Sequence, residues 1–223
     1  MNLRHFYWYF NDIFPDKFID LILRQGLSTE KQIGITGTET NRQKLIDNIK
    51  GNHHRNLKKH PLDAKEKRNL SKKRNSEVCW LSNSYIYDAI NPYIFKANKN
   101  SGWHFQWDWN EPTQFAVYKK NMFYEWHMDS WETPYSVTAN PNLVGKIRKL
   151  SSILLLSDPK DFEGGELELD FKNGGGKDKR IVTELTGKGS LIVFPSFVWH
   201  RLKPVTKGIR YSLATFHLGW PWK

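Results

Sequence analysis

The second half of the chain repeats hydrophobic residues at every second position, which is the period of a β-strand with one buried face. Short segments of this kind are separated by breaks rich in Gly, Pro and Asp. The predicted strands are 114–119, 124–128, 150–156, 166–171, 181–184, 190–194, 198–202 and 209–217. Eight short strands with such breaks indicate a closed or sandwiched antiparallel structure, and a jelly roll is the expected topology.

The first hundred residues carry helical patterns as well as strand patterns. The elements expected there are an extended aromatic run at 6–10, a helix from Pro15 to Gly26, a second helix at 41–51, a strand at 77–81, a helix from Ser84 to Gly102 and a strand at 103–109. Pro92 lies inside the longer helix and is expected to kink or split it. The prediction is therefore a mainly β protein with flanking helices. It is expected to form one domain over 1–223, with helical and strand support in 1–100 and a jelly-roll (double-stranded β-helix) core in 101–220.

Composition narrows the class of protein. A length of 223 residues suffices for one well-buried domain and is short for two. Aromatic residues make up 14% of the chain and include ten Trp, which excludes a disordered protein. Cys79 is the single cysteine, so no internal disulfide forms, and no segment resembles a signal peptide or reaches ~18 uninterrupted apolar residues. These features predict a reducing, cytoplasmic location and no membrane partner.

The net charge of +11 is concentrated in one segment. Residues 53–75 hold nine Lys or Arg against Asp63 and Glu66, a local charge of +7 that leaves +4 for the rest of the chain. The excess therefore belongs to a basic segment and not to a basic fold. A flexible, solvated segment is the simpler interpretation. A contact surface for an acidic partner or for nucleic acid is the alternative.

Candidate chemistry centres on His127 and Asp129, which stand two positions apart and so share one face of an extended segment. His200 ends another predicted strand, which a jelly roll can place beside the first. Two imidazoles and one carboxylate that leave coordination positions open are the ligand set of non-haem Fe(II). Arg210 lies on the last predicted strand, where a guanidinium directed into an apolar barrel requires an anion. A dicarboxylate held by the metal at one end and by Arg210 at the other would satisfy both.

Three motifs then follow one another in a recognisable order. They are the run 118–129 (YKKNMFYEWHMD), the run 162–167 (FEGGEL), and His200 followed by Arg210, Tyr211 and Ser212. Together they resemble the 2-oxoglutarate- and Fe(II)-dependent oxygenases of the prolyl-4-hydroxylase type, over about half of the chain, residues 114–220. The chain also resembles the small prolyl/lysyl-hydroxylase-like oxygenases of bacteria and their phages. For a phage protein, the expected location is the cytoplasm of the host cell.

The resemblance implies a dioxygenase that hydroxylates a peptidyl residue, with proline as the expected one, while 2-oxoglutarate is decarboxylated to succinate and CO2. The implied cofactors are Fe(II), 2-oxoglutarate as co-substrate and O2, with ascorbate in support. The implied residue roles are metal ligation and catalysis for His127, Asp129 and His200, co-substrate binding for Arg210, Tyr118 and Ser212, and lining of the co-substrate pocket for Ile153 and Leu155. Tyr124, Trp131 and Trp199 are candidates for substrate contact, with hydrophobic packing as the alternative for each.

Two positions depart from the family pattern. Asn121 stands where the family usually has Gly in a Tyr-x-x-Gly turn, and Asn tolerates the positive φ that such a turn needs. Leu155 stands where some relatives carry a second tyrosine. Neither departure touches a metal ligand.

Two other functions remain open at this stage. The first is an oxygenase that acts on nucleic acid or a small metabolite. The basic segment favours nucleic acid, but relatives that repair bases carry an Arg where this chain has Phe216. The second is a barrel that binds a metal or a partner without catalysis. Zn, Cu or Ni would also fit the same ligands, because affinity among divalent ions follows their general order.

Overall fold

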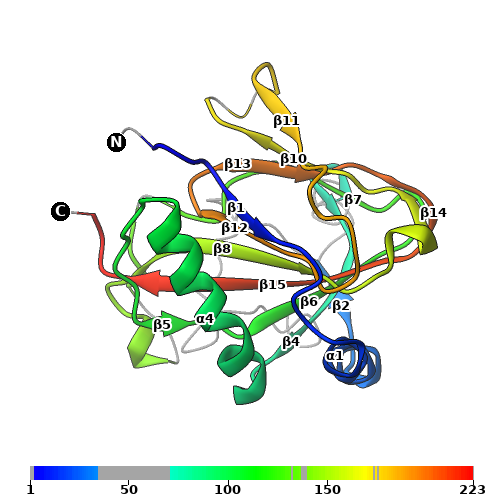
Figure 1. Cartoon of the computed structure of the whole chain (residues 1–223), viewed down its shortest axis with the longest axis horizontal. Coiled ribbons are helices and arrows are strands. Elements are labelled where there is room, and N and C mark those ends of the chain that lie inside the picture. Colours follow the sequence, from blue (N-terminus) through cyan, green and yellow to red (C-terminus); the bar gives the residue numbers. More distant parts are fainter. Residues whose placement is uncertain are drawn as a thin grey trace.

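Two antiparallel sheets form the body of the protein (Figure 1). The computed structural model describes residues 3–34, 71–131, 133–136, 140–172, 174 and 176–222. The larger sheet contains, in spatial order, β1 (Trp8–Phe10), β12 (Leu191–Pro195), β8 (Ile147–Leu155), β15 (Arg210–Gly219), β6 (Thr113–Tyr118), β4 (Glu77–Leu81) and β2 (Gln32–Ile33), with β5 (Trp109–Asn110) paired to β15. The smaller sheet contains β11 (Lys179–Ile181), β10 (Leu167–Asp170), β13 (Trp199–Leu202), β7 (Phe123–His127) and β3 (Arg74–Asn75). The predicted fold class, a mainly β jelly roll with flanking helices, is confirmed.

The alternating segments coincide with strands for seven of the eight core predictions. The exception is 181–184, because β11 ends at Ile181, and after it the Val182 N–H still donates to the Leu167 carbonyl of β10 at 2.8 Å. Glu184 instead accepts a hydrogen bond from the Tyr7 hydroxyl at 2.7 Å. Among the short strands that were not predicted, β9 (Phe162–Gly164) and β14 (Val205–Gly208) pair with each other. Both contain a glycine at positive φ, which interrupts the alternating pattern by which strands are recognised.

The predicted strand at 103–109 is wrong, although its aromatic residues alternate. The backbone here pairs with the side chain of Asn98, whose Oδ1 accepts from the Phe105 N–H at 2.9 Å and whose Nδ2 donates to the Phe105 carbonyl at 2.8 Å. His104 has a φ of 54°, which is incompatible with an extended strand. Trp103 and Phe105 are nevertheless buried, so the alternation reports burial and not strand structure.

Two helices cover the outer face of the larger sheet (Figure 1). α1 (Asp16–Ser28) begins after Pro15, as predicted, but continues past Gly26. A Cβ on Gly26 would lie 2.4 Å from the Phe115 ring, so this glycine serves close helix–sheet contact and does not end the helix. α4 (Ser84–Asn100) is one helix with Pro92 inside it. Pro92 is exposed, and so is Asp88, whose carbonyl loses its amide partner to the proline ring. Two short 3-10 helices, η1 (Pro141–Leu143) and η2 (Pro159–Asp161), lie in loops.

Part of the sequence interpretation falls outside the described residues. The helix at 41–51 lies there, as does the portion 53–70 of the basic segment. The end of that segment lies within the described residues. There the prediction of a flexible, solvated segment is wrong, because Arg74 and Asn75 form β3 and the Arg74 side chain is buried. None of the described helices is long and apolar enough to cross a membrane.

A β-bulge between β7 and β13 aims side chains into the space between the sheets. His200 pairs with His127 and Leu202 pairs with Tyr124, so the two residues between these pairs on β7 oppose the single residue Arg201 on β13. The extra residue lets Tyr124 and His127 both point inward, although strict alternation would place them on opposite faces. Trp126, between them, points outward and lies under the Arg201 guanidinium at 4.9 Å from the ring centre.

Candidate functional site

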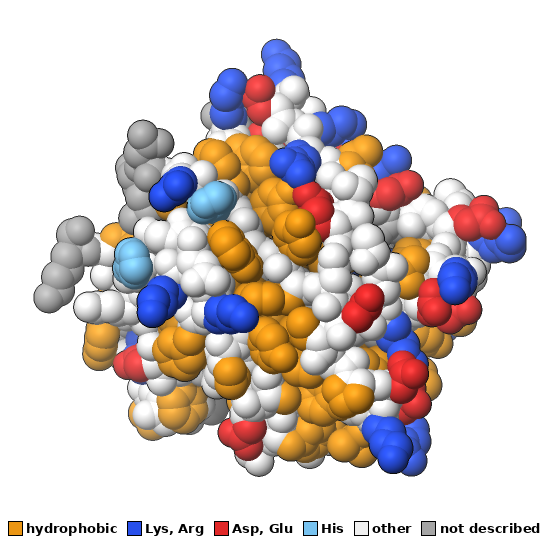
Figure 2. Space-filling model, in the orientation of Figure 1, with side chains coloured by type: hydrophobic (Ala, Val, Ile, Leu, Met, Phe, Trp, Pro, Cys, Tyr) orange, Lys and Arg blue, Asp and Glu red, His pale blue; other side chains and the backbone are white. Residues whose placement is uncertain are grey.

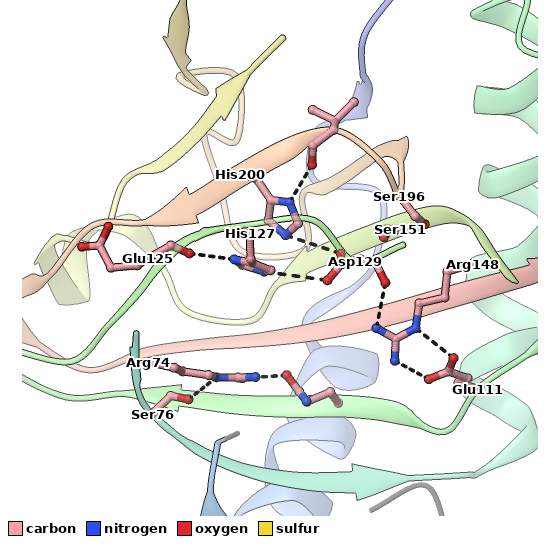
Figure 3. A network of polar contacts seen from close by, with 12 residues as sticks. Arg74, Ser76, Glu111, Glu125, His127, Asp129, Arg148, Ser151, Ser196 and His200 are labelled. Carbon is pink, nitrogen blue, oxygen red and sulfur yellow. Dashed lines mark hydrogen bonds and ion pairs between the residues drawn. The ribbon is translucent and has the colours of Figure 1, made fainter. Parts of the chain in front are cut away.

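Three ligand-type side chains converge between the sheets. His127 ends β7, His200 is its direct partner on β13, and Asp129 follows two residues after β7. Asp129 Oδ1 lies 3.7 Å from His127 Nε2, and Oδ2 lies 3.4 Å from His200 Nε2 (Figure 3). The ligand atoms of all three lie within 4.8 Å of one another, and no other such group of ligand-type side chains occurs in the described part of the chain.

Backbone carbonyls fix the orientation of both imidazoles. His127 Nδ1 lies 2.8 Å from the Glu125 carbonyl oxygen, and His200 Nδ1 lies 3.0 Å from that of Val198 (Figure 3). A carbonyl only accepts, so each Nδ1 carries the proton and each Nε2 presents its lone pair to the shared centre. Burial, and then the neighbouring His200, hold the pKa of His127 well below 6.5. His127 is therefore neutral at pH 7, as a metal ligand must be.

This donor set fits the metal inferred from the sequence. Two imidazole nitrogens and one carboxylate oxygen on one side of a centre form the facial arrangement that non-haem Fe(II) accepts, with positions left open for other ligands. Fe(II) and 2-oxoglutarate are the cofactors implied by the family to which the sequence points. The three residues predicted as ligands are thus the three that the fold brings together.

The pocket beside these residues follows the ladder between β6 and β15. Its first rung pairs Arg210 with Tyr118, the next pairs Ser212 with Ala116, and a third pairs Ala214 with Gln114. All of these residues line the pocket, together with the three ligand-type residues. Neighbouring rungs on one face lie about 7 Å apart, so the pocket extends from a basic end at Arg210 toward Gln114.

Arg210 is a buried cation without an internal anion. It is 3% exposed, and among the described residues no carboxylate or other acceptor binds its guanidinium. Desolvation lowers its pKa to about 10, so the group stays charged at pH 7. A buried, unpaired guanidinium is costly unless an anion meets it. The pocket is therefore suited to a ligand with a carboxylate at this end.

The remaining predicted residues divide between the pocket and its surroundings. Tyr118, Ser212 and Ile153 line the pocket, whereas Leu155 is buried but is not part of the lining. Tyr124 also lines it and stacks on the His127 imidazole, with ring centres 3.5 Å apart.

The two tryptophans proposed for substrate contact do not line the pocket. Trp131 packs edge-on against Tyr135 and lies under the Arg148 guanidinium. The indole of Trp199 packs against Gly174, and a Cβ added to this glycine would lie 2.3 Å from the indole ring. Trp199 neighbours His200 in sequence, and strand alternation sends the two side chains to opposite faces of β13.

Sequence reasoning missed two arginines that lie next to the site. Arg74 donates to Gln114 Oε1 at 2.7 Å and to Ser76 Oγ at 2.7 Å, and its guanidinium lies 4.3 Å from the centre of the Tyr124 ring. Its sequence neighbours, Lys72 and Lys73, gave no sign that this residue differs from the rest of the basic segment.

The second arginine, Arg148, forms a two-pronged ion pair with Glu111 at 2.8 and 2.5 Å and lies 3.6 Å from the centre of the Phe216 ring (Figure 3). The sequence offered one sign of this residue, because the charged Arg148 stands beside the alternating apolar residues of β8. Phe216 lines the pocket, and its ring is covered by Arg148.

The turn between β6 and β7 keeps its geometry without glycine. Asn121 has a φ of 66°, and its N–H donates to the Val205 carbonyl at 2.8 Å. The expectation that Asn would adopt the positive φ of the Tyr-x-x-Gly turn is confirmed.

Comparison with known proteins agrees with this geometry. Residues 113–218 match the 2OG-Fe(II) oxygenase superfamily. A PKHD-type hydroxylase of Teredinibacter turnerae is 33% identical over 101 residues, which cover 45% of this chain and 40% of that protein. A PKHD-type hydroxylase of Xylella fastidiosa is 31% identical over 154 residues, which cover 68% of this chain and 61% of that protein. The chain thus spans less than two thirds of the length of these relatives.

Solved structures show the same fold at low sequence identity. A viral collagen prolyl hydroxylase from Paramecium Bursaria Chlorella virus-1 has a TM-score of 0.59 at 16% identity and covers 97% of each chain. A Pseudomonas putida prolyl-4-hydroxylase has a TM-score of 0.56 at 16% identity, covering 96% of this chain and 92% of that one. Residues 113–218, which include the strands that carry the His127, Asp129 and His200 group, thus match the 2OG-Fe(II) oxygenase superfamily, and the solved structures have the same fold.

Proposed function

We propose that this protein is a 2-oxoglutarate- and Fe(II)-dependent dioxygenase that hydroxylates a peptidyl residue, with proline as the expected one. One observation carries the proposal. A complete group of two histidines and one aspartate faces the same pocket as a buried arginine that has no internal anion among the described residues. In a protein that had lost catalysis and only bound a metal, nothing would offset the free-energy cost of burying that unpaired arginine.

Different residues of the pocket would bind the metal and the co-substrate. His127, Asp129 and His200 would hold Fe(II), which when bound would supply the oxidation by O2 of 2-oxoglutarate to succinate and CO2, with one oxygen atom of O2 entering succinate and the other a substrate C–H bond. Arg210 would bind the distal carboxylate of 2-oxoglutarate, with the hydroxyl groups of Tyr118 and Ser212 beside it. Ile153 and Leu167 provide apolar walls that exclude water from the reacting end.

Support for a peptidyl substrate comes from the relatives and from the end of the pocket opposite Arg210. The curated relatives are described as hydroxylases, and two solved structures of the same fold are prolyl hydroxylases by description. Phe216 lines the pocket at that end and Tyr124 lines it beside His127, and both would contact the substrate. Trp131 and Trp199 lie outside the lining, so a direct substrate contact by either would require a substrate that extends beyond the pocket.

A nucleic-acid substrate is the second candidate and rests on the basic residues of 53–75. On the face seen in Figure 2, Lys and Arg side chains alternate with Asp and Glu around a hydrophobic middle and form no continuous basic strip. The Phe216 position also lacks the arginine of base-repair relatives. Salt-sensitive DNA or RNA affinity that is lost when residues 53–75 are deleted would favour this candidate.

Conversion of 2-oxoglutarate to succinate tests the enzymatic part of the proposal. Purified protein with Fe(II), 2-oxoglutarate and ascorbate should form succinate, and Pro-rich peptides should gain one oxygen by mass spectrometry only when 2-oxoglutarate is present. The His127→Ala variant should form no succinate above background, because it loses one of three metal ligands. Equal succinate formation by the variant and the wild type would contradict the assigned metal site. Succinate formation by the wild type without oxidation of any peptide would support a dioxygenase but contradict a peptidyl substrate.

A further inference from the structure

The aspartate of the metal site lies outside the sheet that holds the two histidines. β7 ends at His127, so the backbone of Asp129 no longer pairs with β13. Its amide instead donates to the carbonyl oxygen of Ser196 at 2.9 Å, and the next amide, that of Ser130, donates to the same oxygen at 2.9 Å. A carbonyl oxygen accepts two hydrogen bonds, so the acceptor capacity of Ser196 is used in full by this segment.

Ser196 is itself hydrogen-bonded to β8. Its N–H donates to the Lys149 carbonyl at 3.0 Å, and its hydroxyl lies 2.9 Å from the hydroxyl of Ser151 (Figure 3). Both serines are buried, with exposures of 0% and 1%. A hydrogen bond between two buried hydroxyls fixes both rotamers, because each group left alone would be desolvated without a partner.

The turn that contains Ser196 also leads to the second histidine. It connects β12 to β13 and is closed by a bond from the Val198 N–H to the Pro195 carbonyl at 2.9 Å. The Val198 carbonyl then accepts from His200 Nδ1. One turn therefore contacts the backbone that carries Asp129 and the ring of His200, although these ligands are 71 positions apart in the chain.

We propose that Ser196 is a positioning residue of the metal site, which holds Asp129 against β8 so that its carboxylate faces both histidines before a metal binds. The inference rests on the proposed function, because it assumes that the three residues bind a metal. The hydroxyl of Ser196 touches neither metal nor substrate and acts through the backbone of Asp129. Without the bond to Ser151, only backbone bonds and the contact of Arg148 with the Asp129 carbonyl would hold this segment, so part of its order would have to be gained during metal binding, and this entropic cost would lower the affinity.

Metal affinity of the apoprotein tests the inference without turnover. The probe is Mn(II), titrated calorimetrically into the full chain after chelation and dialysis. Ser196→Ala and Ser151→Ala remove the same hydrogen bond from opposite ends, and each is expected to raise the Kd for Mn(II) about tenfold. The double variant should match either single variant, because only one bond is lost. Ser152→Ala is the matched control. Its serine is equally buried on the same strand but bonds to His217 at 3.4 Å, away from the site.

A purely structural role predicts a different pattern. In that case the melting temperature of the apoprotein would fall in Ser196→Ala, while the rise in melting temperature on adding Mn(II) would equal that of the wild type. That outcome, or an unchanged Kd in both Ser196→Ala and Ser151→Ala, overturns the inference and leaves the proposed function intact. If the wild type itself binds no Mn(II), the proposed function fails and the inference fails with it. If Ser196→Ala does not fold, Ser151→Ala decides alone.

Discussion

At the scale of single residues, Arg210 has opposite effects on stability and on co-substrate binding. Its guanidinium is 3% exposed and pairs with no anion among the described residues. Arg210→Met is therefore expected to leave the free energy of unfolding of the apoprotein unchanged or raised, because a buried, unpaired charge is removed. The same change should raise the KM for 2-oxoglutarate by about 100-fold or more, since a buried ion pair with the co-substrate is lost. Thermal melts with and without 2-oxoglutarate, together with succinate kinetics, measure both effects.

Arg201→Met is the control for that experiment. Arg201 lies on the outer face of β13, where its Nε donates to Glu168 at 2.6 Å. Its loss should lower stability and leave the KM for 2-oxoglutarate unchanged. If 2-oxoglutarate raises the melting temperature of Arg210→Met as much as that of the wild type, the distal carboxylate does not bind at Arg210.

Asn121 permits a second prediction about a single backbone position. Its φ of 66° is accessible to glycine without strain and to asparagine at small cost, but not to a β-branched residue. Asn121→Gly should change the free energy of unfolding by less than about 0.5 kcal/mol, whereas Asn121→Val should lower it by about 1–3 kcal/mol. Urea unfolding of both variants makes this comparison. Equal stability of the two would show that the turn after Tyr118 relaxes out of positive φ.

At the scale of elements, the contact between α1 and β6 depends on one missing side chain. Gly26 lies inside α1 against Phe115, which is fully buried and has no room to move away. Alanine gains about 1 kcal/mol of helix propensity, but overpacking costs about 1–3 kcal/mol. We expect Gly26→Ala to be destabilising overall, by about 1 kcal/mol in urea unfolding. Addition of Phe115→Leu to this variant should recover part of the loss, and a Gly26→Ala protein more stable than the wild type would contradict the packing argument.

Comparison of the predicted and observed elements shows which parts of the fold and the site can be predicted from a single sequence. Alternation located most core strands because both sheets bury one face against the other, and the ligand-type residues stood out because His127 and Asp129 are close in sequence and His200 and Arg210 follow in order. The register between paired strands could not be predicted from the sequence. The bulge that turns Tyr124 toward His127 results from the pairing of β7 with β13, and the burial of Arg74 results from the pairing of β3 with β7. Such contacts depend on segments far apart in the chain, so local patterns do not encode them.

At the scale of the whole molecule, a buried histidine outside the metal site links folding to pH. His217 is fully buried, its Nδ1 lies 2.7 Å from Asn110 Oδ1, and burial lowers its pKa to about 3. Unfolding returns the ring to water and to its ordinary pKa of about 6.5. Between these values the unfolded state binds the proton and the folded state does not. His217 therefore makes its full contribution to stability above pH 6.5, and that contribution falls as the pH drops toward 3.

The expected loss from this one group between pH 7.5 and pH 5 is on the order of 2 kcal/mol. Urea unfolding of the wild type and of His217→Gln at both pH values isolates it, because titrating groups shared by the two proteins cancel in the difference. His217→Gln should be less stable than the wild type at pH 7.5, since the packed ring is lost, but should lose about 2 kcal/mol less on acidification. His104→Asn, which replaces an exposed ring at a positive φ that asparagine tolerates, should follow the wild type. Parallel losses in the wild type and His217→Gln would mean that His217 is protonated within the folded protein, with water or a rearranged Asn110 beside it.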